Sequence, residues 1–105
     1  MTRAPRGSLR PSSDAPAVGE RSGELARLGG VVIEQILSGA LGAPMDYDQD
    51  HDEWVLLLSG GATLEVADET LDLVAGDWVL LAAHMRHRLV RTVPGTRWLA
   101  VHAAP

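Results

Sequence analysis

Polar side chains crowd the stretch from Tyr47 to Glu53, directly before the apolar run from Trp54 to Leu58. The stretch reads YDQDHDE, and its imidazole, carboxylate and amide groups are the kinds that hold metals or move protons. Polar groups that lead into a buried strand are costly unless they line a pocket or bind something. We therefore interpret this stretch as the wall of a binding site.

Short apolar segments, separated by turn signals, surround this stretch. The alternation of side chains and the Gly, Pro and Asp between the segments predict six or seven short strands and almost no helix. Residues 23–28 fit either a helical turn or an extended lead-in. The pattern predicts an all-β sandwich or barrel. The expected strands are residues 31–38, 54–58, 62–66, 70–73, 78–81, 87–92 and 97–102.

The chain of 105 residues is long enough for one domain. Residues 1–23 are rich in Pro, Ser, Gly and Arg without apolar periodicity, so we expect a disordered or loosely attached arm before a domain over residues 24–105. A domain of that size has a small core, and residues 54–58 are apolar on both faces. These two features predict a homodimer.

Composition excludes several classes of function. The chain has no Cys and no Lys, which excludes disulfides, thiolate metal sites and a lysine Schiff base. The net charge of -5 argues against a nucleic-acid surface. No apolar run fits a signal peptide or a membrane span, so we expect a cytoplasmic protein without a membrane partner.

Two spaced motifs resemble those of the cupins. Glu53, six residues and Gly60 resemble the second half of the first cupin motif. Gly76, five residues, Ala82, four residues and His87 resemble the second motif, with Ala82 where a Pro is usual. The chain looks like a small single-domain cupin of the phosphomannose-isomerase-like branch, and the resemblance implies a jelly-roll, double-stranded β-barrel.

The sequence also departs from the family pattern at positions that usually bind the metal. Metal-binding cupins usually supply two His from the first motif, then a Glu, and a His from the second. The two first-motif His positions fall on Tyr47 and Gln49, whereas Glu53 and His87 remain. The Asn that often ends the second motif is Arg91 here.

A metal site could be rebuilt from neighbouring residues. Tyr47, Gln49, His51 and Glu53 share parity, so an extended segment would point all four inward. A set of His51, Glu53 and His87, with Gln49 as a further ligand, suits Fe, Mn, Ni or Zn. A bulge in this stretch would turn His51 outward, and the alternative for His51 is a solvated loop residue.

Three functions stay open. The first is a metal-dependent isomerase, lyase or oxygenase acting on a small polar metabolite, of the sugar or keto/hydroxy-acid class. The second is a metal-free pocket in which Tyr47, Gln49 and an inward Arg91 bind the ligand, with Glu53 and His87 as an acid–base couple or as part of a sensor. The third is a structural dimer whose site has decayed.

Overall fold

The computed structural model describes residues 3–103, and nearly all of its regular structure is β-strand. This confirms the all-β prediction. A short 3-10 turn, η1 (Ser12–Asp14), precedes the strands. Within the described residues, no helix has the length and apolar character needed to cross a membrane. The strands are β1 (Glu20–Leu28), β2 (Val31–Ser38), β3 (Met45–Tyr47), β4 (Glu53–Ser59), β5 (Gly61–Val66), β6 (Glu69–Val74), β7 (Trp78–Leu81), β8 (His87–Thr92) and β9 (Thr96–His102).

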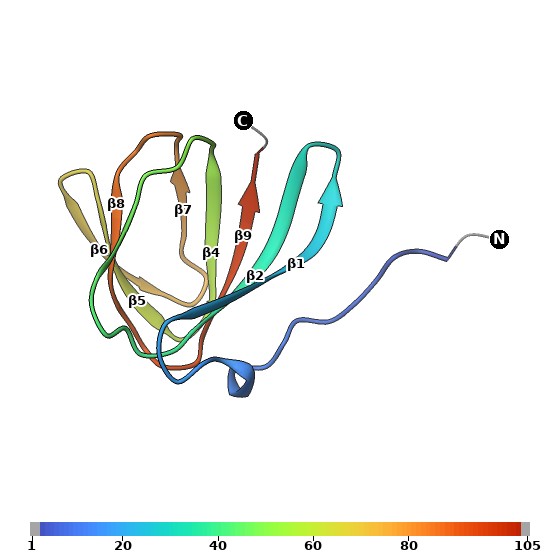
Figure 1. Cartoon of the computed structure of the whole chain (residues 1–105), viewed down its shortest axis with the longest axis horizontal. Coiled ribbons are helices and arrows are strands. Elements are labelled where there is room, and N and C mark those ends of the chain that lie inside the picture. The colour runs from blue at the N-terminus through green and yellow to red at the C-terminus, as the bar shows by residue number, and fades with distance from the viewer. Residues whose placement is uncertain (1–2, 104–105) are drawn as a thin grey trace.

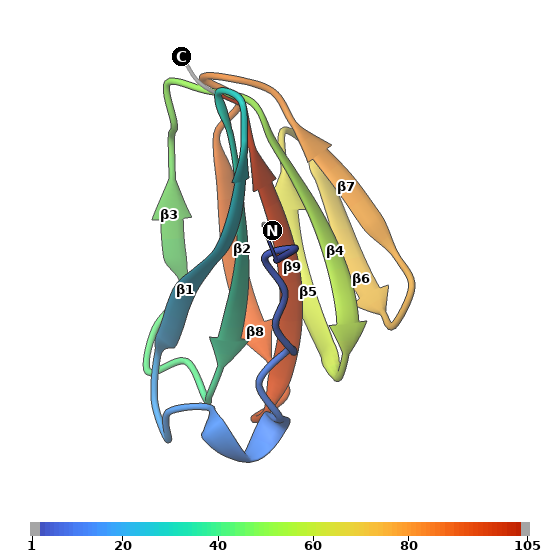
Figure 2. The ribbon, with the colours of Figure 1, turned by 90° about the vertical axis from the view of Figure 1, so that its right-hand side faces the viewer.

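The strands form two sheets that face each other (Figures 1 and 2). The larger sheet has the order β1-β2-β9-β4-β7, and the smaller has the order β3-β8-β5-β6. All pairs of neighbouring strands are antiparallel, and chain neighbours such as β4 and β5 lie in different sheets. This is the predicted jelly-roll arrangement.

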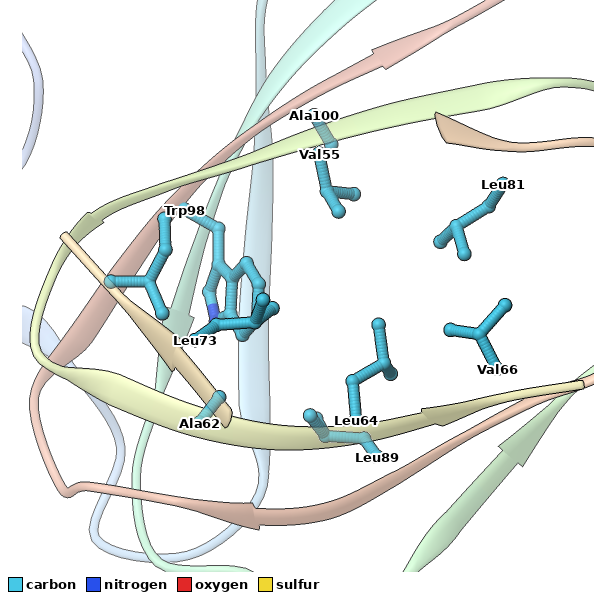
Figure 3. Packing of buried hydrophobic residues seen from close by; sticks show 10 residues of the cluster. Val55, Ala62, Leu64, Val66, Leu73, Leu81, Leu89, Trp98 and Ala100 are labelled. Atoms are coloured by element: carbon cyan, nitrogen blue, oxygen red, sulfur yellow. The ribbon is translucent and has the colours of Figure 1, made fainter. Parts of the chain in front are cut away.

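The core lies between the sheets, where alternate residues of both point inward (Figure 3). On β4 the side chains of Val55 and Leu57 are buried, and on β5 those of Ala62 and Leu64 are buried. Trp98 of β9 fills one end of this space. Apolar packing therefore occupies the end nearest the β4–β5 turn and leaves the other end to polar side chains.

β1 and β3 were not predicted as strands. β1 is exposed along almost its whole length and pairs only with β2, so its sequence carries no burial pattern. Its pairing is interrupted by a bulge between Glu24 and Ala26. β3 is only three residues long and pairs with β8.

The segment before β1 contacts the larger sheet (Figure 2). The backbone N–H of Arg10 donates to the side-chain oxygen of Gln35 at 2.8 Å, and the amide of Gln35 donates back to the carbonyl of Arg10 at 2.9 Å. β1 begins at Glu20, so residues 20–23 belong to the strand. The division of the chain at residue 23 stays a prediction. The contacts of Arg10 and the start of β1 at Glu20 argue against an arm that is loosely attached up to that residue.

Candidate functional site

A cavity of about 100 Å³ lies between the two sheets, beyond the apolar core. Polar groups reach it from six strands and the loop after β3, because inward-facing positions near the strand ends carry Glu, Tyr and His instead of Leu and Val. The polar lining consists of Glu20, Glu34, Tyr47, Gln49, Glu53, His87 and His102, and the apolar lining of Val55, Leu64, Leu81, Leu89 and Trp98.

Tyr47 is held at the cavity wall from two sides. Its hydroxyl donates to Glu20 at 2.9 Å, and the other carboxylate oxygen of Glu20 accepts from Ser38 at 2.5 Å. The ring of Tyr47 stacks on that of His87, with centroids 5.2 Å apart and planes 12° apart. Burial, with the charge of Glu20, raises the pKa of Tyr47, so its phenol stays protonated.

His87 has a fixed tautomer in its neutral form. Its side chain is buried, and Nδ1 lies 3.0 Å from the carbonyl oxygen of Met85. A carbonyl oxygen only accepts hydrogen bonds, so Nδ1 carries the proton and Nε2 keeps its lone pair. His87 therefore offers a base or a hydrogen-bond acceptor to the cavity.

Glu53 faces the same cavity from β4 with only 6% of its surface exposed. Desolvation raises the pKa of this carboxyl, and the charge of Glu34 adds to the rise. The charges of His102 and His87 and a hydrogen bond with Gln49 oppose it. Because desolvation is the largest influence, Glu53 holds its proton to a higher pH than an exposed Glu.

Gln49 carries an unsatisfied polar atom. Within the part of the chain that the structure describes, its Oε1 is buried and has no hydrogen-bond partner. The backbone around it is fixed, because its carbonyl accepts from the N–H of His84 at 2.7 Å. A buried acceptor of this kind costs free energy until a donor reaches it, so it is suited to a ligand hydroxyl or N–H.

His51 does not line the cavity, although Tyr47, Gln49 and Glu53 of the same parity do. Its Nδ1 lies 3.0 Å from Asp50, and its Nε2 lies 2.9 Å from Nδ1 of His102. Among residues 3–103, no three His, Asp or Glu side chains are arranged to hold a metal ion. The predicted ligand set of His51, Glu53 and His87 is therefore not brought together, and its donors do not fit a metal at the cavity.

Arg91 does not face inward, so that prediction is wrong. The pairing of β8 with β5 shifts by one residue between Leu89 and Arg91, which makes Val90 a bulge. A bulge reverses the alternation that follows it, so Thr92 is buried and Arg91 is exposed. Its guanidinium lies 3.5 Å from the hydroxyl of Thr63, on the outer side of the smaller sheet.

Three residues of the polar lining, Glu20, Glu34 and His102, were not predicted. His102 lies opposite Glu53 in the β4–β9 pairing, and its Nε2 is 2.8 Å from Glu34 and 3.7 Å from Glu53. His102 shares parity with the buried Trp98 on β9, and this shared parity could have indicated an inward side chain.

A wider cleft of about 650 Å³ adjoins the cavity, since Tyr47 and His87 line both. Arg88 pairs with Asp46 at 2.7 Å, and Arg86 lies 3.7 Å from Asp48. Three carboxylates and two guanidinium groups line the cleft in total, so it has no excess of positive charge. Its charged residues are Asp46, Asp48, Glu65, Arg86 and Arg88.

Comparison with known proteins identifies the family. The cupin domain model matches residues 32–102. The crystal structure of a putative mannose-6-phosphate isomerase from Ralstonia eutropha is 35% identical, with alignment over 94% of this chain and 100% of that chain and a TM-score of 0.76.

More distant structures share the fold. KdgF from Halomonas is 18% identical over 83% of this chain and 82% of that chain, with a TM-score of 0.71. A cupin superfamily protein from Desulfitobacterium hafniense is 21% identical over the full length of both chains, with a TM-score of 0.69. With the family model covering more than half of its residues, this chain belongs to the cupin family.

Proposed function

We propose that this cupin binds the carbonyl end of a small sugar in its cavity and catalyses proton transfer of the isomerase type. The observation that carries the proposal is the pair of buried groups that line the cavity with the unpartnered oxygen of Gln49: Glu53 from the larger sheet and His87 from the smaller sheet. Buried titratable groups at a cavity are candidates for acid–base chemistry.

Glu53 and His87 favour protonation states that suit an acid and a base, respectively. Neutral His87 has a free lone pair at Nε2, whereas burial favours the protonated form of Glu53. In the proposed reaction His87 removes a proton from the carbon beside the carbonyl, and Glu53 donates its proton to the carbonyl oxygen. His87 then returns a proton to the former carbonyl carbon, while the Glu53 carboxylate takes the proton of the neighbouring hydroxyl, which becomes the new carbonyl. Both side chains regain their starting forms, and the aldose–ketose exchange is complete.

The volume and charge of the site favour an uncharged, polyhydroxy ligand. A cavity of about 100 Å³ admits only the reacting end of a sugar, and the adjoining cleft of about 650 Å³ can take the rest. Glu20 and Glu34 line the cavity, and both arginines of the cleft are paired with aspartates. Carboxylate and phosphate ligands would meet like charge there, so a neutral sugar fits better than a keto or hydroxy acid.

The similarity to the Ralstonia eutropha structure supports the isomerase class, because that structure is described as a putative mannose-6-phosphate isomerase. Many cupins bind divalent metals. In this chain His51, one of the predicted donors, lies away from the cavity, and the described residues hold no group of three His, Asp or Glu side chains that could bind a metal. The proposed proton transfer therefore uses side chains alone. A metal-free binding or sensor protein is the second candidate, since the free oxygen of Gln49 suits binding without chemistry.

Deuterium exchange tests the proposal directly. The purified full chain is incubated in D2O with a panel of unphosphorylated aldoses and ketoses, and NMR follows deuterium at the carbon beside the carbonyl. We expect incorporation and conversion of at least one sugar. Glu53→Gln and His87→Gln are each expected to slow exchange by about 100-fold or more, the usual contribution of a general acid or base.

His84→Gln is the matched control, because His84 is exposed and lies on the loop before β8. It should exchange at the rate of the unmodified chain. Binding of a sugar without exchange would favour the binding or sensor function. If no sugar binds or exchanges, or if both site variants keep full activity, the proposal is wrong.

A further inference from the structure

The chain has two glutamines, and their side chains differ in hydrogen bonding. Gln35 is buried, and both ends of its amide are paired with the backbone of Arg10, at 2.8 Å and 2.9 Å. Gln49 lines the cavity, and its Oε1 is the one buried side-chain nitrogen or oxygen atom of residues 3–103 without a hydrogen-bond partner. A buried acceptor in this state costs free energy, so a ligand that supplies a donor is favoured at Gln49.

The segment that carries Gln49 is tied to its surroundings at three points. The carbonyl of Gln49 accepts from the N–H of His84 at 2.7 Å. Asp52 accepts from the N–H of Ala83 at 2.8 Å through its carboxylate, and from the N–H of Ala103 at 3.0 Å through its carbonyl. The backbone of Gln49 therefore has a fixed place beside the cavity, and its acceptor is positioned before a ligand arrives.

Contact with Glu53 decides which end of the Gln49 amide is free. Desolvation raises the pKa of Glu53, and a hydrogen bond with the Gln49 side chain opposes that rise. A hydrogen bond that favours the ionised carboxylate comes from a donor, so the amide N–H of Gln49 faces Glu53 and the amide oxygen is left for another group. The free acceptor thus lies beside the carboxyl group that protonates the carbonyl oxygen in the proposed reaction.

We propose that Gln49 makes the site specific for sugars with a hydroxyl group on the carbon beside the carbonyl, by accepting a hydrogen bond from that hydroxyl. This inference rests on the proposed function, which places the carbonyl oxygen of the ligand at Glu53. The neighbouring hydroxyl oxygen of an aldose or ketose is adjacent to the carbonyl oxygen, so it meets the protein group adjacent to Glu53. When this hydroxyl gives its proton to Glu53 later in the reaction, the hydroxyl formed at the former carbonyl carbon takes its place as the donor to Gln49.

A 2-deoxy sugar has no donor for Gln49. Such a sugar would fill the cavity and leave Oε1 of Gln49 unpaired, and a site built around a hydrogen bond discriminates against the ligand that lacks it. Two other acceptors of the cavity already have partners. Glu20 accepts from the hydroxyl of Tyr47 at 2.9 Å, and Glu34 lies 2.8 Å from Nε2 of His102. Selection at this position therefore depends on Gln49.

Matched sugars test the inference with the full chain. NMR measures the dissociation constants of D-glucose, D-mannose and 2-deoxy-D-glucose, and the deuterium exchange of each in D2O. We expect the unmodified chain to bind the better of the two 2-hydroxy sugars at least about 10-fold more tightly than the 2-deoxy sugar. Gln49→Met keeps the length of the side chain and removes its acceptor, so it should reduce the preference to about 3-fold or less. Any effect of this change on Glu53 applies to all three sugars and cancels in the ratio.

Gln35→Met is the matched control, because it makes the same substitution at the glutamine that is already paired and does not line the cavity. It should leave the preference unchanged. Circular dichroism checks folding, with Gln49→Leu and His84→Gln as the second site variant and the second control.

Equal binding of the 2-hydroxy and 2-deoxy sugars, or an unchanged preference in Gln49→Met, would overturn the role of Gln49 even if deuterium exchange supports the proposed function. The expected preference without any exchange would support Gln49 and contradict the proposed reaction. If none of the sugars binds, both proposals are wrong.

Discussion

At the scale of single residues, only some of the side chains that line the cavity could be predicted from the sequence. Alternation along an extended chain placed Tyr47, Gln49 and Glu53 on one side, and all three line the cavity. His51 shares that parity but turns to His102, because a partner on β9 offers it a hydrogen bond. Alternation within one segment contains no information about such a partner.

Glu53 makes the stability of the protein depend on pH. Its folded-state pKa is raised by desolvation and by Glu34 from β2, against the opposing effects of His87 from β8, His102 from β9 and Gln49. A carboxyl with a raised folded pKa stabilises fully below its unfolded pKa, and that contribution is lost as the pH rises through the folded pKa.

We therefore expect Glu53→Gln to raise the free energy of unfolding at pH 7 by about 1 kcal/mol, as is common when a functional polar group is removed. Urea unfolding between pH 4 and pH 8 should show a smaller decline for Glu53→Gln than for the unmodified chain. Glu69→Gln, an exposed change on β6, is the control. A pH slope that is identical in all three proteins would contradict the role of Glu53.

At the scale of elements, strands with one buried face were predictable and strands without one were not. β2, β7 and β8 have the bounds expected from their apolar residues and turn signals. β1 and β3 gain their structure from pairing with a neighbour, which is a long-range effect. The bulge at Val90 likewise depends on the register with β5, and it reversed the expected direction of Arg91.

The turn between β4 and β5 gives a test of close packing between elements. Gly60 has a φ of +97°, and a Cβ there would lie 2.3 Å from the hydroxyl oxygen of Thr96 on β9. Gly76 has a φ of +94°, but a Cβ there would meet nothing within 4 Å. Replacing each of these two glycines by Ala therefore distinguishes the cost of backbone strain, which both share, from the cost of a steric clash, which only Gly60 has.

Gly76→Ala should cost about 1 kcal/mol for the left-handed conformation alone. Gly60→Ala should cost about 2 kcal/mol more, because the added methyl group overlaps Thr96. Chemical denaturation of both variants measures the difference. Equal losses would mean that Thr96 moves away without cost, and that the approach of β9 to this turn is not tightly set.

At the scale of the whole molecule, the outer face of the larger sheet is apolar where β4 pairs with β7. Trp78 is 61% exposed and Leu80 is 58% exposed, both on β7. Trp54 of β4 lies beside Trp78, with ring centroids 6.2 Å apart. Contiguous apolar surface of this kind marks an interaction site. A homodimer formed through this face stays a prediction.

We expect Leu80→Glu to shift the chain from dimer to monomer, with at least a 10-fold rise in the dissociation constant, since a charge would be buried at the interface. Analytical ultracentrifugation over a range of concentrations measures this. Val74→Glu is the matched control, because Val74 is 62% exposed but lies on β6 of the other sheet. A monomer at every concentration, or equal effects of the two changes, would rule out this face as the dimer interface.

The long outer strand β1 has a consequence for aggregation. Its free edge presents unpaired backbone N–H and C=O groups to which a strand of another chain could add, the first step toward a fibril. Arg21, Glu24 and Arg27 place charges along this strand, and the bulge at Leu25 breaks its regular spacing. Both are features that oppose edge-to-edge pairing. The polar sequence that made β1 difficult to predict as a strand is thus the same feature that opposes the addition of another chain at its edge.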